Sequence, residues 1–384
     1  MEEPSVSSTI VIIGAGVIGL SCALKLQSLP QFNGISGHEW RILLVAKEWP
    51  TSIPGAPETH SVNYASIWAG SHVRPIPATS TQLRSEATYL KQTVEEFERL
   101  LAVDPSVGLT RTVGVEYLDA PSPDYVSQTG ARFEAESGLR GYRALGGTEL
   151  PEGVALGFEY ETFCINSPVY CRNLLRKLIL QGGETLQRDL MSEWEAFSLV
   201  RDVELVVNAS GVGFGDHLSF PTRGQIVLTN LTQASKTVTR QHQDGTWSFI
   251  IPRFFNGGTI VGGTKEPGEW NSEASMSTRE DLLKAGEKLM PYCSSPNTAS
   301  ISKTEAMRVI ADVVGRRPTR QGGMRVEVEE KRVDKGATRL PSRRVIHAYG
   351  AGGRGFELSW GVANEVAQLA SQLISKSPSY MPRL

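Results

Sequence analysis

Several patterns that would assign a class of function are missing from this chain of 384 residues. Lys and Arg number 39 against 41 Asp and Glu, so the net charge of -2 gives no long-range attraction to nucleic acid or an anionic membrane. No apolar run approaches the roughly 20 residues that a membrane-spanning helix needs. The opening residues MEEPSVSS lack the basic region of a secretory signal. We therefore expect neither a nucleic-acid nor a membrane partner.

Cysteine is scarce as well, with only Cys22, Cys164, Cys171 and Cys293. They form no C-x-x-C pair, and no Cys/His cluster has the spacing of a zinc site. We therefore expect buried, reduced thiols, a reducing compartment and no metal.

The strongest motif lies in the stretch TIVIIGAGVIGLSCALKL near the start of the chain. Ile10–Ile13 is apolar and rich in β-branched residues, which is typical of a strand buried on both faces. Gly14-x-Gly16-x-x-Gly19 follows and leads into a helical pattern. At such a junction the glycines permit a tight turn, close approach of a pyrophosphate and packing of helix on strand. A second apolar strand over residues 41–45 completes a predicted dinucleotide-binding βαβ unit.

This fingerprint occurs once. Gly211-x-Gly213-x-Gly215 follows a strand over 205–208, but its spacing does not suit a second pyrophosphate. One site suits a flavin that the substrate reduces directly, and it also suits a dehydrogenase using one NAD. The acid expected at the tip of the second strand is displaced to Glu48, which a plain surface charge would explain equally well.

Further patterns outline the remaining elements. Apolar spacing predicts a helix over 79–101 opened by a Thr79-x-x-Gln82 capping box, and a last helix over 360–374. Ser277-x-x-Glu280 opens another helix, and MRVEVEEKRV alternates as a half-buried strand does. Nucleotide-binding features occur at both ends and in the middle of the chain. We therefore expect a discontinuous cofactor domain (1–78, 160–222 and 303–384) and an interleaved substrate domain (79–159 and 223–302).

Three later segments carry a resemblance: VVNASGVG, VVGRRPTRQGGMRVEVE and VIHAYGAGGRGFELSWGVA. Together with the N-terminal fingerprint and the blocks PTRGQIVL, FIIPR and VGGTKEPGEWN, they resemble the FAD-dependent D-amino-acid oxidase family over nearly the whole chain. That family includes the D-aspartate oxidases. The resemblance implies an α/β fold, with a Rossmann-like FAD-binding domain and an interleaved β-rich substrate-binding domain. It also implies non-covalent FAD and the oxidation of a D-amino acid by dioxygen to a 2-oxo acid, ammonia and hydrogen peroxide.

The resemblance assigns roles to single residues. Arg317 matches the arginine that holds the substrate α-carboxylate, and a guanidinium fork suits that task. Gly353 matches the glycine whose carbonyl receives the substrate amine. Hydride transfer to flavin N5 needs no protein base, and His347 is interpreted as a hydrogen-bonded core histidine. The expected cofactor-binding residues are Gly14, Ala15, Gly16, Val17, Ile18, Gly19, Ala46, Lys47, Ser66, Ala69, Gly70, Ser71, Leu190, Ser210, Gly211, Arg317, Gly352, Gly353, Gly355, Phe356 and Glu357.

The choice between acidic and neutral D-amino acids rests on a few positions. Phe249 stands where the family usually has a tyrosine whose hydroxyl supports the carboxylate. A pocket for D-aspartate or D-glutamate also needs a second cation, because a buried carboxylate without a partner costs several kcal/mol. His72, Arg74 and Arg354 are the candidates, with Arg240 and His242 behind them. The set favours acidic substrates. A broad oxidase of neutral D-amino acids and a glycine or sarcosine oxidase stay open.

The C-terminal residues Arg383 and Leu384 share the basic-then-leucine ending of the S-K-L peroxisomal signal, although Pro382 departs from it. A peroxisomal location through an import receptor is one expectation, and a cytoplasmic protein with a tail of no function is the other. The sequence leaves open whether the chain forms a homo-oligomer.

Overall fold

A computed structural model of the protein describes residues 7–32, 39–51, 53, 56, 59–294, 307–331, 334–335, 338–339 and 342–375. The chain divides into two compact units. Unit 1 comprises residues 1–61, 171–220 and 318–384, and unit 2 comprises residues 62–170 and 221–317. The expected boundaries differ from these, because residues 62–78, 160–170, 221–222 and 303–317 belong to unit 2. Pro382–Leu384 lies outside the described residues, so the import signal stays a prediction.

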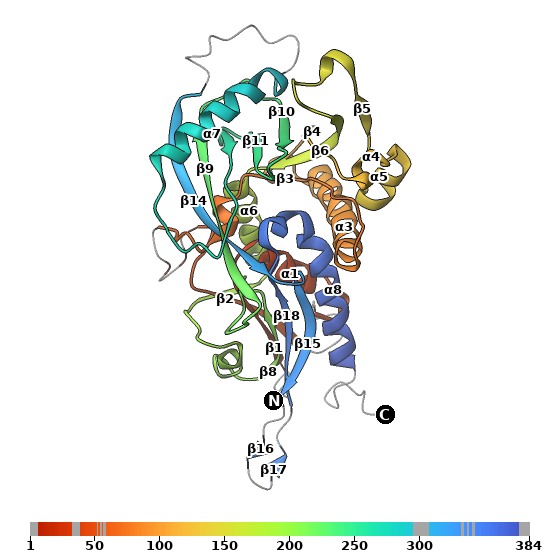
Figure 1. Ribbon diagram of the computed structural model, residues 1–384. Coiled ribbons are helices and arrows are strands. Elements are labelled where there is room, and N and C mark those ends of the chain that lie inside the picture. Colours follow the sequence, from red (N-terminus) through yellow and green to blue (C-terminus); the bar gives the residue numbers. More distant parts are fainter. Residues whose placement is uncertain are drawn as a thin grey trace. The chain divides into compact units, whose positions relative to one another are not determined.

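Unit 1 is built on a six-stranded sheet with the order β15-β18-β8-β1-β2-β7 (Figure 1). Five strands run parallel, and β15 is antiparallel to β18 at one edge. The helices α1 and α8 pack against each other. The bounds are β1 Ser7–Ile13, β2 Glu39–Ala46, β7 Glu184–Gln187, β8 Val203–Asn208, β15 Arg325–Lys331, β18 Arg343–Tyr349, α1 Val17–Gln27, α6 Ser167–Leu180 (shared with unit 2), α8 Gly355–Ser375 and the 3-10 turns η1 Pro30–Phe32, η3 Glu193–Ser198 and η5 Gly352–Arg354. A small ribbon pairs β16 (Asp334–Lys335) with β17 (Thr338–Arg339).

The predicted βαβ unit is confirmed. The middle of β1 is fully buried because its apolar side chains cover both faces of a parallel sheet. The last helix is confirmed, although α8 begins five residues before the predicted start. The β-strand predicted in MRVEVEEKRV is β15.

Unit 2 is built on a ten-stranded sheet with the order β13-β9-β12-β11-β10-β4-β6-β3, to which β14 adds beside β9 and β5 beside β6. The strand bounds are β3 Ser71–His72, β4 Leu109–Leu118, β5 Arg143–Leu145, β6 Leu156–Ile165, β9 Ser219–Thr229, β10 Lys236–Gln241, β11 Trp247–Pro252, β12 Thr259–Gly262, β13 Glu266–Pro267 and β14 Val309–Arg320. The helices are α2 Ala65–Trp68, α3 Thr81–Val103, α4 Pro123–Val126, α5 Gly130–Ser137 and α7 Met276–Leu289, with 3-10 turns η2 Gly147–Glu149 and η4 Met290–Tyr292. The expected fold class, a Rossmann-like part with an interleaved β-rich part, is confirmed.

Two predicted helix starts are wrong by one or two residues. The N-cap of α3 is Ser80, whose hydroxyl accepts the N–H of Leu83, so Thr79 and Gln82 form no capping box. The N-cap of α7 is Ser275 rather than Ser277. In both cases neighbouring Ser and Thr residues offer equivalent caps, and only the local backbone decides among them.

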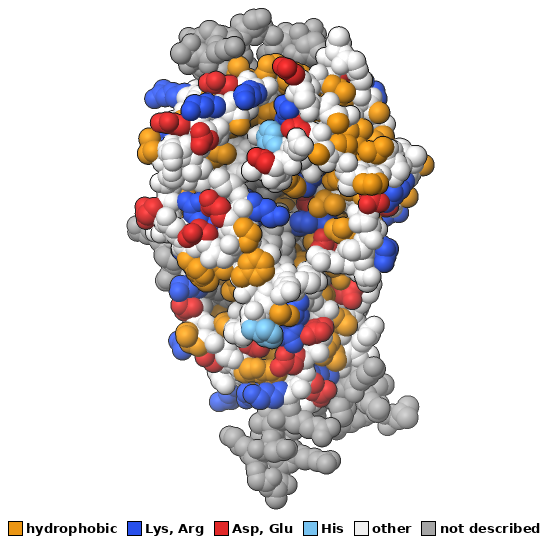
Figure 2. All heavy atoms as spheres, viewed as in Figure 1, with side chains coloured by type: hydrophobic (Ala, Val, Ile, Leu, Met, Phe, Trp, Pro, Cys, Tyr) orange, Lys and Arg blue, Asp and Glu red, His pale blue; other side chains and the backbone are white. Residues whose placement is uncertain are grey.

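The four cysteines are buried free thiols, as expected. None of the described helices is long and apolar enough to cross a membrane. Acidic and basic side chains are interspersed on the face drawn in Figure 2, in line with the near-zero net charge.

An aromatic cluster in unit 2 allows a test of the core. The ring of Phe97 on α3 is fully buried and lies edge-on to Phe163 at 5.7 Å and to Tyr170 at 5.8 Å. We expect Phe97→Ala to lower the free energy of unfolding by about 4 kcal/mol, because it removes a large side chain and leaves a cavity. Val103→Ala on the exposed end of the same helix should change it by less than about 0.5 kcal/mol. Urea denaturation measures both, and similar losses in the two variants would contradict the packing described.

Candidate active site

The turn between β1 and α1 in unit 1 has the geometry that a pyrophosphate needs. Gly14 has φ +102°, and a Cβ added there would lie 2.4 Å from the carbonyl oxygen of Ala209. A Cβ on Gly19 would lie 1.8 Å from the carbonyl oxygen of Gly14, so helix and turn meet without room for a side chain. Gly16 is the N-cap of α1 and provides no side-chain cap. The helix N-terminus is thus formed by backbone alone, and this arrangement binds phosphate groups.

Next to this turn, the end of β8 adds a polar group. β1 lies between β2 and β8, so the order of the sheet reverses at this point, which is where open α/β sheets bind their ligands. Ala209 donates its N–H to Ile13 and brings Ser210 and Gly211 to the turn. The hydroxyl of Ser210 is buried and has no hydrogen-bond partner within the described structure. An unsatisfied buried hydroxyl beside the phosphate turn fits a bound dinucleotide.

Near the end of β2, the expected cofactor residues Ala46, Lys47 and Leu190 have different environments. Ala46 accepts the N–H of Arg188, while Lys47 is exposed and pairs with Asp189 at 2.6 Å. Leu190 is buried beside them. Glu48 accepts hydrogen bonds from the N–H and hydroxyl of Ser61, so its carboxylate has a structural partner within unit 1.

Four expected cofactor residues, Ser66, Ala69, Gly70 and Ser71, belong to unit 2 rather than to the predicted cofactor domain. They follow one another from α2 to β3. The carbonyl of Ala69 accepts from Ser167 at 2.8 Å and from the buried Arg253 at 3.0 Å. Arg253 was not among the candidates, because nothing in the block FIIPR distinguishes a buried arginine from an exposed one.

The glycine-rich turn after β18 brings together the other expected cofactor residues of unit 1. Gly352 and Gly353 lie in η5, and Gly355, Phe356 and Glu357 begin α8. Gly353 is exposed, whereas Phe356 and Glu357 are buried. Arg354 at the end of η5 donates from Nε to Glu357 at 2.7 Å, so this candidate cation is paired with a carboxylate in the first turn of α8.

Arg317 lies near the end of β14, the last residue of unit 2. Its Nη1 donates to the main-chain oxygens of Arg223 at 3.4 Å and Thr264 at 3.2 Å. A Cβ on Gly224 would lie 2.3 Å from the same nitrogen, so the guanidinium rests where any other residue would place a side chain. Burial lowers the pKa of Arg317, and the nearby carboxylate of Glu266 opposes that shift. The group is therefore a fixed cation laid flat on the sheet.

Strand registers identify the face on which this arginine lies. Ile226 shares a face with Gly224, and it is paired through Gly262 to Phe249. The half-buried ring of Phe249 lies so close to Gly262 that a Cβ there would be 2.4 Å from it. Phe249 and the Arg317 guanidinium therefore occupy the same face of the ten-stranded sheet, which we call the arginine face.

Two of the other candidate cations lie on this face with partners of their own. Arg74 is buried, 3.5 Å from Glu116 and 4.1 Å above the ring of Trp247. His72 is 2.8 Å from the hydroxyl of Thr237. Burial, and secondly the charge of Arg74, lower the pKa of His72 to about 3. His72 is thus a neutral hydrogen-bonding group and cannot serve as a cation.

The two remaining candidate cations, Arg240 and His242, lie on the opposite face of the sheet. Arg240 and His242 alternate with Thr239 and Gln241, so they lie on the face of β10 opposite to the arginine face. Both contact Asp119, with Arg240 at 2.8 Å and His242 at 3.4 Å. The structure therefore corrects the expectation that these two residues stand behind the substrate-binding cations.

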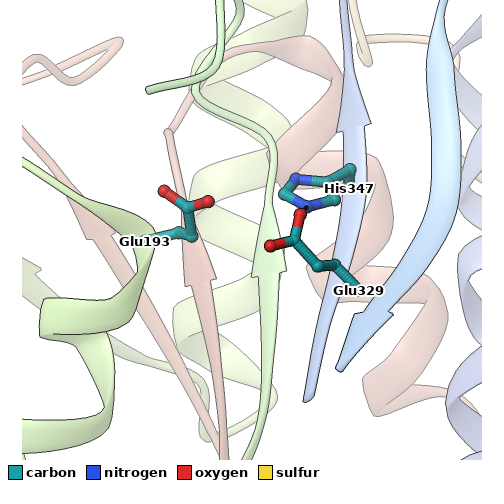
Figure 3. Close-up of side chains that lie close together, drawn as sticks. All are labelled: Glu193, Glu329 and His347. Carbon is teal, nitrogen blue, oxygen red and sulfur yellow. Dashed lines mark hydrogen bonds and ion pairs between the residues drawn. The ribbon is translucent and has the colours of Figure 1, made fainter. Parts of the chain in front are cut away.

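His347 is held by two partners in unit 1, Glu329 and Asn208, of which Figure 3 shows Glu329. Its Nε2 lies 3.0 Å from Glu329, and its Nδ1 lies 3.3 Å from the side-chain nitrogen of Asn208. Because the Asn208 oxygen accepts the N–H of Ser210, the amide nitrogen faces the ring and donates to Nδ1. Nε2 then carries the proton and donates to Glu329, which also pairs with Arg325. Although Glu193, Glu329 and His347 lie close together, this tautomer leaves the imidazole no lone pair for a metal.

Sequence patterns alone did not single out Gly224, Trp247, Glu116 or Thr239. Gly224 could have been found, because it stands in PTRGQIVL, one of the blocks that carry the resemblance. The other three are ordinary members of alternating strands, and only the register of the sheet brings them to the arginine face.

Fold and site together define a class: an α/β enzyme with one dinucleotide-binding turn and a separate β-rich unit that carries a buried arginine. The family model for DAO, FAD dependent oxidoreductase, matches residues 9–369. The chain is 41% identical over 368 residues to a D-aspartate oxidase of Talaromyces thermophilus, covering 94% of each chain. It is 31% identical to a D-amino-acid oxidase of Schizosaccharomyces pombe, covering 96% of this chain and 98% of the other. The chain therefore belongs to the DAO family of FAD-dependent oxidoreductases.

Solved structures agree on the fold. A glycine oxidase from Geobacillus kaustophilus matches with a TM-score of 0.66 at 16% identity, covering 96% of this chain and 95% of that one. An L-proline dehydrogenase from P. horikoshii matches with a TM-score of 0.65 at 14% identity, covering 98% and 96%. FAD is thus the dinucleotide of this family, and the alternative of a single NAD is excluded.

The close approach at Gly14 provides a test of FAD binding. We expect Gly14→Ala to weaken FAD binding at least tenfold, because the new Cβ meets the Ala209 carbonyl and displaces the phosphate turn. Gly182→Ala is the matched control, since Gly182 also has a positive φ but nothing within 4 Å of an added Cβ. Titration of the apoprotein with FAD, followed by flavin fluorescence, measures both. Equal FAD affinity in the two variants would contradict the assignment of this turn.

Proposed function

We propose that this protein is an FAD-dependent oxidase of D-amino acids that favours acidic ones such as D-aspartate and D-glutamate. The observation that carries the proposal is Arg317, a buried cation held flat over Gly224 by two main-chain carbonyls. A guanidinium fixed in this way is suited to two parallel hydrogen bonds with an α-carboxylate. The D-aspartate oxidase that is 41% identical to this chain supports the acidic preference.

The work of the protein side chains is placement. Arg317 would hold the α-carboxylate, and the Gly353 carbonyl would accept a hydrogen bond from the amine. Phe249 provides an apolar wall without the hydroxyl that a tyrosine would offer. No protein group needs to remove the α-proton, in line with a His347 that is engaged on both ring nitrogens. Such fixed orientation supplies much of the rate enhancement of an enzyme of this kind.

The cofactor would be held by the β1–α1 turn, the end of β8 and the glycine-rich turn after β18 in unit 1. Ser66, Ala69, Gly70 and Ser71 of unit 2 stay predicted cofactor residues on the basis of the resemblance. Bound FAD supplies the capacity to take the α-hydrogen of the substrate as a hydride and to pass the electrons to dioxygen, giving hydrogen peroxide. The imino acid product then hydrolyses to the 2-oxo acid and ammonia.

Peroxide release from a panel of substrates tests the proposal. D-aspartate, D-glutamate, D-alanine, D-valine, glycine, sarcosine and the L-enantiomers are compared on the purified holoenzyme. We expect turnover of D-amino acids only, with the acidic ones fastest. Turnover restricted to glycine and sarcosine would overturn the proposal, and faster turnover of D-alanine and D-valine would replace the acidic preference with a neutral one.

A substitution tests the anchor. We expect Arg317→Lys to lower kcat/KM for every D-amino acid by about a hundredfold, because lysine offers a point charge in place of a bidentate fork. Arg316→Lys is the neighbouring control and should retain activity, since Arg316 donates its hydrogen bonds to Asn63 and to the carbonyl of Trp270. Steady-state peroxide assays compare the two variants. If Arg317→Lys kept full kcat/KM, the α-carboxylate would be bound elsewhere.

A further inference from the structure

We propose that Arg74 binds the side-chain carboxylate of an acidic D-amino acid, and that Glu116 is its counter-ion until the substrate carboxylate takes its place. This inference rests on the proposed function, and it gives the acidic preference a physical origin. It concerns only residues of unit 2.

The first step is the position of Arg74 relative to Arg317. Trp247 on β11 lies opposite Thr264 if the β11–β12 register is continued, and the N–H of Thr264 bonds Gln225, the neighbour of Gly224 on β9. The Arg317 guanidinium lies over Gly224, and the Arg74 guanidinium lies over Trp247. Neighbouring strands are about 4.8 Å apart, so β9 and β11, which carry these two positions on one face, are about 10 Å apart. A short dicarboxylate lying between them can give one carboxylate to each guanidinium.

The second step is the pairing of Arg74 with Glu116. Both side chains are buried, with exposed fractions of 8% and 2%, yet their charged atoms are 3.5 Å apart. A well-formed contact between a guanidinium and a carboxylate is about 2.8 Å long. The flat stacking of Arg74 on Trp247 fixes the guanidinium from one side. The contact of Glu116 with Arg74 is therefore long, whereas the Arg74 guanidinium itself is fixed. Such a contact suits a carboxylate that a substrate carboxylate can replace.

The third step is that Glu116 can lose its charge in place. Burial raises the pKa of Glu116 to about 7, against the opposing effects of Arg74, Gln241 and Tyr160. Tyr160 and Gln241 lie 3.4 and 3.5 Å from its oxygens and can hydrogen-bond the neutral acid. When a substrate carboxylate binds Arg74, Glu116 takes up one proton from solvent, and the number of buried charges stays the same. Binding of an acidic substrate is thereby coupled to proton uptake.

A further polar group on the same face is unsatisfied. Thr239 is level with both Phe249 and Glu116, and only 1% of it is exposed. Its hydroxyl has no hydrogen-bond partner within the part of the chain that the structure describes. A buried hydroxyl without a partner is unfavourable, so Thr239, on the strand next to β11, fits a polar ligand on the arginine face.

The pH dependence follows from the groups that face Glu116. These are Arg74, Tyr160 and Gln241, with His72 beyond Arg74 and neutral across the working range. Asp119 and His242 lie on the opposite face. Below pH 7 Glu116 is protonated and does not compete with the substrate carboxylate for Arg74. Above pH 7 Glu116 is ionised and competes for Arg74. Acidic substrates should therefore lose activity relative to neutral ones as the pH rises through about 7.

The test is the ratio of kcat/KM for D-aspartate to that for D-alanine, measured with the holoenzyme between pH 5.5 and 9. The ratio cancels the ionisation of the substrate amine, which both substrates share. In the unmodified protein we expect the ratio to fall about tenfold for each pH unit above 7. Glu116→Gln should abolish this fall. Arg74→Met should lower the ratio at least a hundredfold at pH 6 while D-alanine is still oxidised.

Two further variants keep the result interpretable. Because Arg74→Met leaves a buried carboxyl group alone, the double variant Arg74→Met/Glu116→Gln removes both charges and should show the same loss of D-aspartate activity. Arg240→Gln removes a charge from the opposite face of the same sheet and should leave the ratio unchanged. An unchanged ratio in Arg74→Met and in the double variant would overturn the inference. If the unmodified protein oxidised neither D-alanine nor D-aspartate, the proposed function would be overturned instead.

Discussion

The constraint on which the rest depends is the cost of keeping a guanidinium out of water. Unit 2 buries the Arg317 guanidinium, and this is feasible because Gly224 has no side chain in the space that the guanidinium occupies. The carbonyls of Arg223 and Thr264 then accept its N–H groups. Both of these acceptors are neutral carbonyl groups, and the nearby carboxylate of Glu266 favours the charged form of the guanidinium. The register of β9, β12 and β11 decides which other side chains share that environment.

Local patterns predicted those elements whose causes are local. The βαβ unit was readable because an apolar β-branched run, three spaced glycines and a second apolar run each have one physical explanation. The helices α3 and α7 were predicted as well, but their first residues were wrong. Ser80 and Ser275 have neighbouring hydroxyl residues that could cap the same helix. The unit boundaries near residues 62 and 171 could not be placed, because α6 and the segment around α2 have no change in composition there.

The candidate site was predictable only in part, and for a similar reason. Residues contributed by a motif, such as Gly14 and Ser210, lie at the predicted turn. The residues chosen for their charge lie in different environments. Arg354 in η5 pairs with Glu357 at the start of α8, and Arg240 lies on the face of β10 opposite to the arginine face. The alternation of side chains along a strand shows that Arg240 and Thr239 lie on opposite faces of β10. Which of these faces is the arginine face depends on the strands that pair with β10. Long-range register is a property of the sheet and cannot be read from one strand.

The burial of the cysteines has a consequence for the proposed function, in which the enzyme would release hydrogen peroxide. Peroxide attacks thiolates, and burial raises the pKa of Cys22 and Cys171 to about 12 and that of Cys293 to about 11, with Cys164 raised as well. At neutral pH almost no thiolate is present, and solvent does not reach the sulfurs. Oxidative damage is then directed to exposed thioethers such as Met191, whose sulfoxide cells can reduce. The buried cysteines should therefore resist oxidation by hydrogen peroxide.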